Sequence, residues 1–233
     1  AALGADEHSI ARAVTRHENR DASQTSFILS WRAPGRLEPD FAAFAMAAQL
    51  LSNQLYKQYS FREESAPYSI FTDLKPTENT GIFTLSLSVM PQFFDDSLLG
   101  VKKLLKDFTA AAPAPAEMAD ARGAVKNLNQ TLANLTAKEI AADRASNEAL
   151  GLGYDYKEKL TARMLAASPE EIQQAARKYL NPEVASVFTV GPNVGKKKKT
   201  AQRGLVQIGV LAAVALGAFT TPLFNQLTLT AIL

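Results

Sequence analysis

Cysteine is absent from the 233 residues of the chain. This excludes disulfide bonds, thiolate metal sites and a cysteine nucleophile, and it fits a reducing compartment. Histidine is nearly absent, since His8 and His17 in a polar N-terminal stretch are the only two. Neither a Gly-rich phosphate loop nor a Gly-x-Ser-x-Gly nucleophile elbow occurs. We interpret both histidines as solvated residues and predict no bound metal and no cofactor.

An excess of one charge is also missing, because 25 Lys and Arg residues and 23 Asp and Glu residues leave a formal net charge of +2. A charge this small argues against a surface that binds nucleic acid. Hydrophobic residues make up 47% of the chain and charged residues 21%, a composition typical of a domain with a packed core.

Charged residues are missing altogether from residues 204–233. The first twenty of these residues are mostly apolar, and as a helix they would span about 30 Å, the thickness of a bilayer's hydrocarbon core. The alternatives are a buried helix or an amphipathic one. Apolar residues occupy every side of the helix, which favours a membrane span. We therefore predict a C-terminal transmembrane anchor over 204–233.

A basic linker, residues 193–203, precedes the predicted span. Its charged residues are Lys196, Lys197, Lys198, Lys199 and Arg203. Basic residues beside a span mark the side that is not translocated, and each adds about 1 kcal/mol of attraction to an anionic leaflet. We interpret this run as a membrane flank. The soluble part is then expected in a stroma, matrix or cytoplasm, and we favour a chloroplast over a mitochondrion or a bacterial inner membrane.

Three small residues lie four positions apart within the predicted span: Gly209, Ala213 and Gly217. Small residues at this spacing form a flat stripe that lets another helix approach closely. We predict that the stripe packs against a transmembrane helix of a partner subunit, although such stripes also occur by chance.

Between a polar arm, residues 1–23, and the linker, the sequence alternates between strand and helix patterns. The predicted strands are 25–32, 68–73, 82–89 and 185–190. The predicted helices are 40–59, 92–108, 117–150, 155–165 and 168–180, with Asp40 as the first N-cap and a capping box at Ser168 and Glu171. This order predicts one α+β domain over 24–192, with helices on one face of a mostly antiparallel sheet.

The strand at 82–89 has the clearest alternation. Its apolar positions are Phe83, Leu85, Leu87 and Val89, and its polar positions are Thr84, Ser86 and Ser88. Alternation with a period of two predicts one buried sheet face and one polar face.

Three stretches of the domain resemble a known family. They are APGRLEPD at 33–40, LLSNQLYKQYSFREESAPYSI at 50–70 and SPEEIQQAARKYLNPEVASVFTVGP at 168–192. Together they resemble one half-unit of the pitrilysin and insulinase-like zinc peptidases, which include the mitochondrial processing peptidase. The resemblance implies the fold of that half-unit, with a ferredoxin-like flavour. No internal repeat is present, so the chain holds one half where the enzymes use two.

The resemblance also identifies two candidate peptide-binding residues, Arg62 and Tyr68. In the family, the corresponding Arg and Tyr reach the bound peptide from the half without the metal. They are seven positions apart there and six here, and Pro67 replaces part of the usual Gly-Leu. The alternative is that Arg62 pairs with a neighbouring carboxylate and Tyr68 packs as an ordinary strand aromatic.

The family's zinc motif, His-x-x-Glu-His, is missing, because the helix at 40–59 contains neither His nor Glu. We therefore expect no peptide hydrolysis by this chain alone. Two functions remain: an inactive structural subunit of a membrane complex, or the non-metal subunit of a two-chain membrane peptidase that processes precursor or transit peptides. In the family the sheets of two halves face each other, so the face of Thr84, Ser86 and Ser88 is expected to meet a partner, such as a zinc-bearing peptidase-like chain.

Overall fold

Five strands form one sheet in the order β1-β5-β2-β4-β3. The computed structural model describes residues 13–59, 67, 69–132 and 136–192. The strands are β1 (Thr15–Asn19), β2 (Thr25–Pro34), β3 (Ser69–Pro76), β4 (Thr80–Val89) and β5 (Ser186–Gly191). The helices are α1 (Phe41–Tyr59), α2 (Phe94–Ala110), α3 (Pro115–Leu132), α4 (Ala137–Ala149), α5 (Tyr156–Ala166) and α6 (Pro169–Tyr179), with short 3-10 turns η2 (Pro91–Phe93) and η3 (Pro182–Val184). The prediction of an α+β fold is confirmed.

The sheet is mixed, which corrects the prediction of a mostly antiparallel sheet. Strands β5, β2, β4 and β3 pair antiparallel along this order, but β1 runs parallel to β5. Strand β1 belongs to the segment predicted as a polar arm. Its backbone is joined to β5 by hydrogen bonds from Val187 N–H to the Val14 carbonyl at 2.7 Å and from Arg20 N–H to the Gly191 carbonyl at 3.0 Å. The arm lacks the apolar alternation of a strand because every residue of β1 is exposed.

The alternation predicted for β4 is confirmed, because its odd-numbered residues from Phe83 to Val89 are at most 1% exposed. Strand β2 alternates in the same way, with Phe27, Leu29 and Trp31 buried opposite them. The indole of Trp31 donates to the Asn181 carbonyl at 2.9 Å, so its polar atom is satisfied at the edge of the core. Both central strands therefore direct their large side chains toward the same layer of helices.

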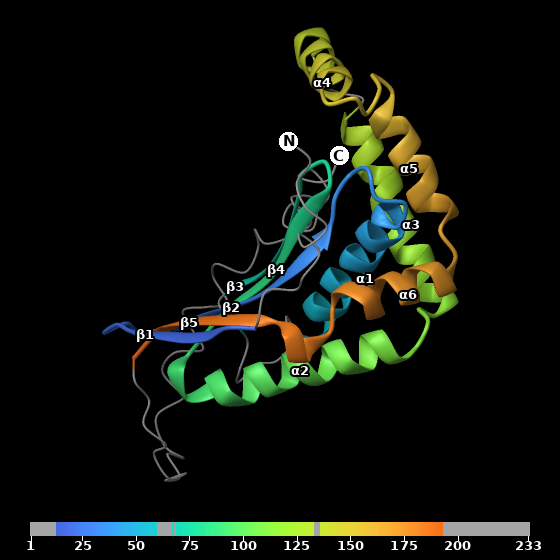
Figure 1. Cartoon of the computed structure of the whole chain (residues 1–233). Coiled ribbons are helices and arrows are strands. Elements are labelled where there is room, and N and C mark those ends of the chain that lie inside the picture. The colour runs from blue at the N-terminus through green and yellow to red at the C-terminus, as the bar shows by residue number, and fades with distance from the viewer. Residues whose placement is uncertain (1–12, 60–66, 68, 133–135, 193–233) are drawn as a thin grey trace, which may run out of the picture.

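Helix α1 is the centre of that layer. Phe44 and eleven further residues of the helix are buried, among them a run from Phe44 to Leu51 with no exposed member. The ring of Phe44 contacts those of Phe83 and Tyr179 edge-on, with centroids 5.8 and 5.2 Å away. Figure 1 shows α1 between the sheet and the outer helices α3, α5 and α6. Contact on both sides explains why α1 is apolar around most of its circumference.

Asp40 does not cap α1 with its side chain, contrary to prediction. Its Oδ2 accepts instead from Lys178 Nζ at 2.7 Å and from the Tyr179 hydroxyl at 3.0 Å, while Oδ1 is buried without a hydrogen-bond partner. The Asp40 backbone carbonyl still begins the helix by accepting from Phe44 N–H at 2.9 Å. The carboxylate was misassigned because its partners on α6 are more than a hundred positions away in the sequence.

The helical region predicted over 117–150 is two helices, α3 and α4, separated by residues outside the described part at 133–135. Helix α4 starts with a capping box in which Glu139 N–H donates to Thr136 Oγ1 at 3.3 Å. The predicted capping box of α6 is confirmed, with Glu171 N–H donating to Ser168 Oγ at 3.2 Å. The sequence contains a signal for the start of α4, because Thr136 and Glu139 have the same spacing as Ser168 and Glu171, but it was overlooked within an alanine-rich stretch without Pro or Gly.

The loop between β2 and α1 lies directly on the turn between β3 and β4. Arg36 N–H donates to the Thr77 carbonyl and Leu37 N–H to the Glu78 carbonyl, both at 2.9 Å. A Cβ atom on Gly35 would collide with the backbone of residues 79 and 80, so glycine is required at this crossing. Backbone contacts therefore hold the β2–α1 loop against the β3–β4 turn at this end of the sheet.

Candidate functional site

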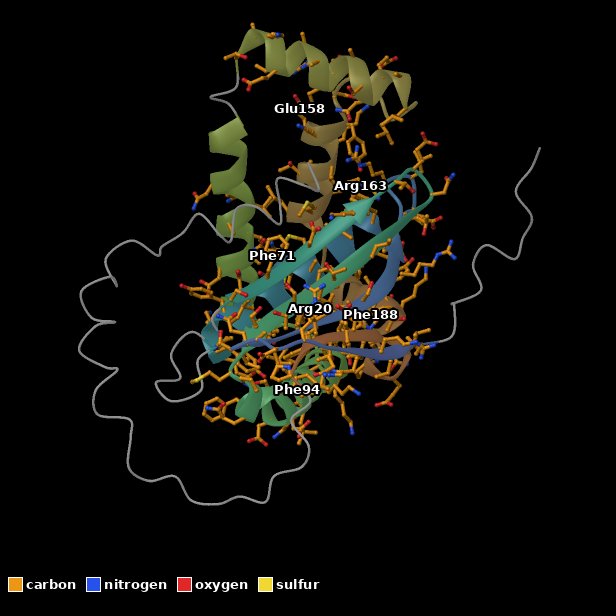
Figure 2. All side chains as sticks on the ribbon, turned by 90° about the vertical axis from the view of Figure 1, so that its left-hand side faces the viewer. Arg20, Phe71, Phe94, Glu158, Arg163 and Phe188 are labelled. Carbon is orange, nitrogen blue, oxygen red and sulfur yellow. The ribbon has the colours of Figure 1, made fainter. Side chains whose placement is uncertain are left out.

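The sheet has one face covered by helices and one face that no described element covers. In Figure 1 the helices lie to the right of the sheet, and Figure 2 looks onto its opposite side, with Phe71 and Phe188 labelled. We call this second side the open face. Because residues paired across strands share a face, the strand register identifies its members. They are Arg16, Glu18, Ser26, Ile28, Ser30, Arg32, Ser69, Phe71, Asp73, Lys75, Ile82, Thr84, Ser86, Ser88, Ser186, Phe188 and Val190.

One row of the open face crosses all five strands. From β1 to β3 it runs Arg16, Phe188, Ile28, Ser86 and Phe71. Side chains opposite each other on neighbouring strands have Cβ atoms about 4.5–5.5 Å apart, so the members of this row contact their neighbours. Phe188 is 48% exposed and Ile28 is 42% exposed. The row therefore contains three apolar side chains, Phe188, Ile28 and Phe71, of which the first two are open to solvent, with Ser86 between Ile28 and Phe71. We call these three residues the apolar stripe.

Two further apolar residues lie on the open face outside this row. Ile82, at the other end of β4, is 54% exposed, and Val190 is 38% exposed. Single exposed apolar residues need no explanation, but several on one uncovered sheet face are typical of a surface that meets another protein. The open face is therefore the strongest candidate for a functional surface in the described residues.

The polar positions predicted for this face, Thr84, Ser86 and Ser88, lie on it and are half-buried. Ser88 Oγ is 2.8 Å from Ser26 Oγ, and Ser86 Oγ donates to the Phe71 carbonyl at 3.3 Å. The hydroxyl groups of Ser86 and Ser88 are therefore held by neighbouring strands. That these three residues contact a partner stays a prediction.

The charged residues on the open face lie around the apolar stripe. Lys75 Nζ lies 3.1 Å from Asp73 Oδ2, with the Asp73 side chain only 13% exposed. Arg32 Nε donates to Thr80 Oγ1 at 3.0 Å, which fixes its guanidinium beside the turn between β3 and β4. Basic and acidic groups are both present, so the face carries no strong charge of one sign.

Sequence reasoning missed the apolar members of the open face, although a signal for them existed. In Phe27-Ile28-Leu29 and in Val187-Phe188 the strict alternation of apolar and polar residues is interrupted. An apolar run within a strand indicates that both faces of the strand carry apolar side chains. Only the inward-facing members were assigned, because the clean alternation of β4 was extended to the whole sheet.

The described part of the chain does not contain a zinc site of the type found in the resembled peptidases. Helix α1, which would carry the zinc motif, contains no His and no Glu. No three His, Cys, Asp or Glu side chains among the described residues are grouped so that they could hold a metal ion. His17 lies exposed on β1 and belongs to no such group.

Perturbed ionisable groups lie on the helix side of the sheet. The hydrogen bond to Asp40 raises the pKa of the Lys178 amine, and burial raises the pKa of the Tyr179 hydroxyl. Burial also raises the pKa of Tyr156 to about 12, although the charges of Arg36 and Arg163 oppose the shift. These groups join α6 and α5 to the start of α1. They stabilise the helix layer and do not face the open side of the sheet.

Several predicted site residues lie outside the described residues. These are Arg62, Tyr68, Lys196, Lys197, Lys198, Lys199, Arg203, Gly209, Ala213 and Gly217. The predicted transmembrane anchor at 204–233 lies outside them as well. Within the described residues, no helix combines the length and the apolar character that a membrane crossing requires. The roles assigned to these residues stay predictions.

Comparison with known proteins identifies the domain. Residues 5–139 match the family model described as the peptidase M16 inactive domain. No curated protein sequence matches the chain.

Solved structures of related domains have the same fold. The peptidase M16 inactive domain from Pseudomonas fluorescens matches with a TM-score of 0.70 at 21% identity, over 80% of this chain and 45% of that one. The inactive peptidase domain of a zinc protease from Bordetella parapertussis matches with a TM-score of 0.61 at 17% identity, over 79% and 99%. The periplasmic protease PqqL from Escherichia coli matches with a TM-score of 0.63 at 13% identity, over 78% and 21%.

The chain thus spans less than half of the Pseudomonas fluorescens protein and about a fifth of the Escherichia coli protease. At these identities the structures show the fold, and the family model shows the relationship. The resemblance drawn from the three sequence stretches is confirmed, as is the expectation that the chain does not hydrolyse peptides alone. The chain belongs to the peptidase M16 inactive domain family, and it is not catalytic on its own.

Proposed function

We propose that the chain is a catalytically inactive, peptidase-like subunit that binds another peptidase-like chain through the open face and is held at a membrane by its C-terminal segment. The observation that carries the proposal is the apolar stripe through Phe188, Ile28 and Phe71 on a sheet face that no described element covers. Burying such a stripe against a partner is favourable by about 25 cal/mol per Å² of apolar surface.

The family indicates which kind of partner fits the open face. Half-units of these peptidases have a common fold, and a lone inactive half leaves its sheet uncovered on one side. A second half, with a zinc motif of the type His-x-x-Glu-His, presents a surface of similar shape. The polar residues Thr84, Ser86 and Ser88 lie within the same surface and can satisfy hydrogen bonds at the contact.

The sequence of residues 193–233 supports attachment to a membrane. The uncharged segment is long enough to span a bilayer, and the basic linker before it would remain on the side of the soluble domain. A chain that ends at Pro192 should then be recovered without detergent, whereas the full chain should resist carbonate extraction. Release of the full chain by carbonate would contradict the anchor.

The docking experiment compares two exposed apolar residues on opposite sides of the domain. Phe188, 48% exposed, lies on the open face, and Leu99, 70% exposed, lies on α2. Phe188→Lys should abolish co-purification of a chain with a His-x-x-Glu-His motif from native membranes, and Leu99→Lys should leave it unchanged. The triple variant of Thr84, Ser86 and Ser88 to Lys should behave like Phe188→Lys. Equal recovery of the partner with all variants would contradict docking on this face.

The small-residue stripe has a separate test. Replacing Gly209 and Gly217 by Leu should weaken assembly into the complex while the soluble domain stays folded, because large side chains prevent close helix approach. Assembly at the wild-type level would contradict a role for the stripe.

A second function is favoured by the match to PqqL, a protease that contains this fold. In that case the chain is the non-metal subunit of a two-chain membrane peptidase acting on precursor or transit peptides, and Arg62 and Tyr68 contact the peptide. Arg62→Ala and Tyr68→Phe should then lower the peptidase activity of the isolated complex without changing its composition. Unchanged activity would favour the structural role.

A further inference from the structure

The β1 edge of the sheet has backbone groups that point away from the domain. In a parallel pair, alternate residues of a strand direct their N–H and C=O groups toward the neighbour. The Val14 carbonyl and the Arg20 N–H both bond to β5, so the even-numbered residues face inward. The odd-numbered Thr15 and His17 therefore face outward. The Thr15 carbonyl accepts only from the side chain of Arg16, at 3.2 Å, within the described part of the chain.

The sequence of this edge is complementary to itself. If a second copy of β1 lies antiparallel to the first, with the two His17 residues opposite each other, Arg16 of each copy lies opposite Glu18 of the other. The outward-facing His17 residues then form a hydrogen-bonded pair. The charged residues form the adjacent non-hydrogen-bonded pairs, in which side chains are closest.

Other registers are unfavourable. Outward groups must meet outward groups, so the register can change only by two residues at a time. A shift by two residues in one direction places Arg16 opposite Arg16 of the second copy. A shift in the other direction places Glu18 opposite Glu18 of the second copy. Like charges directly opposite each other destabilise a strand pair. Among the registers that pair the charged residues within Thr15–Asn19, only the one centred on His17 gives two attractive charge pairs. A register centred on Asn19 pairs Glu18 with Arg20, but Arg20 lies beyond the end of the strand.

We propose that the chain forms a symmetric homodimer in which two β1 edges pair antiparallel about His17. Such an interface uses the same surface on both copies, as closed two-fold dimers do. It joins the two sheets into one and extends both open faces, because Arg16 and Glu18 are the row neighbours of Phe188 and Val190. The dimer does not depend on the proposed partner, which would contact the face and not the edge.

The ion pair between Glu18 and Arg20 does not oppose the pairing. Glu18 Oε1 lies 2.9 Å from Arg20 Nε, with side chains 62% and 70% exposed. An exposed ion pair of this kind contributes little, so Glu18 can exchange it for Arg16 of the second copy. The competing explanation is that the charges on β1 keep other strands away from the edge, as charged edge residues often do. The two explanations predict opposite results for charge reversal.

Cysteine cross-linking tests the register, because the natural chain has no thiol. Opposite residues of a hydrogen-bonded pair have Cα atoms about 5.5 Å apart, within the range of a disulfide. Full-length His17→Cys in mild detergent should therefore become mostly covalent dimer on oxidation or with a short bismaleimide. Thr15→Cys is the control, because its two thiols would be about 13 Å apart along the strands. Equal cross-linking of the two variants, as a contact elsewhere in the chain would give, or none at His17, overturns the proposal.

Charge reversal tests the complementarity, with the cross-linking yield of His17→Cys as the readout. Arg16→Glu or Glu18→Arg alone should weaken dimerisation about tenfold, because each places like charges together twice. The double variant should restore it, and an equimolar mixture of the two single variants should form mixed dimers. Stronger dimerisation of the single variants would show that the charges protect the edge, and an unchanged or unrestored yield would equally overturn the proposal.

Discussion

The two faces of β4 are made by the same ten residues and have opposite roles. Phe83, on the helix side, is fully buried, whereas Ile82, its neighbour on the open face, is 54% exposed. The helix side contains a continuous core of strand and α1 residues. The open face contains an apolar stripe between short hydroxyl side chains and has no covering element in the described residues. The packed core and the proposed binding surface thus lie on opposite faces of one strand.

This difference predicts how much a substitution on each face should change the free energy of unfolding. On the helix side, a changed side chain disturbs close-packed neighbours and the free energy of unfolding falls. On the open face, the same change disturbs few packed neighbours, so the free energy of unfolding should change little. The variants below are ordered from the largest expected effect on the free energy of unfolding to the smallest.

Phe83→Ala should lower the free energy of unfolding by about 3–5 kcal/mol, because it removes a buried ring and leaves a cavity. The ring lies 5.8 Å from that of Phe44 and 6.0 Å from that of Trp31. Ile82→Ala is the matched change on the open face and should cost less than about 1 kcal/mol. Urea denaturation followed by circular dichroism measures both. An equal loss of unfolding free energy in the two variants would mean that the open face is covered.

Ser168→Ala should lower the free energy of unfolding by about 1 kcal/mol, since it removes the side-chain cap of α6, a helix that packs on α1. Thr136→Ala removes the same type of cap from α4, where Asn147 is the buried residue. A helix with so few buried contacts unfolds locally, so this variant should lower only its amide protection from hydrogen exchange. A global loss with Thr136→Ala would show that α4 is part of the core.

Tyr156→Phe should leave the free energy of unfolding at pH 7 unchanged or raise it by up to about 1 kcal/mol, because the buried hydroxyl has no hydrogen-bond partner among the described residues. In the folded protein the pKa of Tyr156 is raised to about 12. An unfolded phenol ionises near pH 10, so wild-type stability should fall as the pH rises from about 10 to about 12.

Tyr156→Phe should lose less stability than the wild type as the pH rises through this range. Thermal unfolding at several pH values measures the loss. Tyr154→Phe is the control, because Tyr154 is 58% exposed and its ring contact with Arg144 survives the change. Identical alkaline profiles for Tyr156→Phe and the wild type would contradict the shifted pKa.

Lys75→Ala should change the free energy of unfolding by about 0.5 kcal/mol or less, because the Lys75 side chain is 76% exposed and surface ion pairs contribute little. The small effect should disappear at high salt. Urea titrations at low and high salt measure it. A cost above 1 kcal/mol that persists in salt would show that this edge of the open face is buried.

Local sequence patterns were sufficient for most of the fold. The alternation from Phe83 to Val89 identified the buried side of β4, and Ser168 with Glu171 located the start of α6. Each of these signals is contained within a few neighbouring residues. The family resemblance came from stretches of the same kind, and α1 without a zinc motif led to the expectation that the chain alone does not hydrolyse peptides.

Long-range pairing was not accessible to the same reasoning. Strand β1 has no apolar alternation, and only its hydrogen bonds to β5 make it a strand. The carboxylate of Asp40 binds Lys178 and Tyr179, which no local rule connects to a helix start. The open face was predicted by its polar residues alone, and Ile28 and Phe188 were not assigned to it.

The position of β5 between β1 and β2 has a consequence for biosynthesis. Val14 N–H donates to Ser186 Oγ across 172 positions of sequence, so β1 has no neighbour until almost all of the domain has left the ribosome. At about 5–20 residues per second, that delay is roughly 9–34 s. During this interval one edge of β2 is also bare, and the nascent chain presents unpaired strand edges that aggregate readily. A newly made chain should therefore depend on chaperones until residues 186–191 emerge, and premature termination before them should produce insoluble protein.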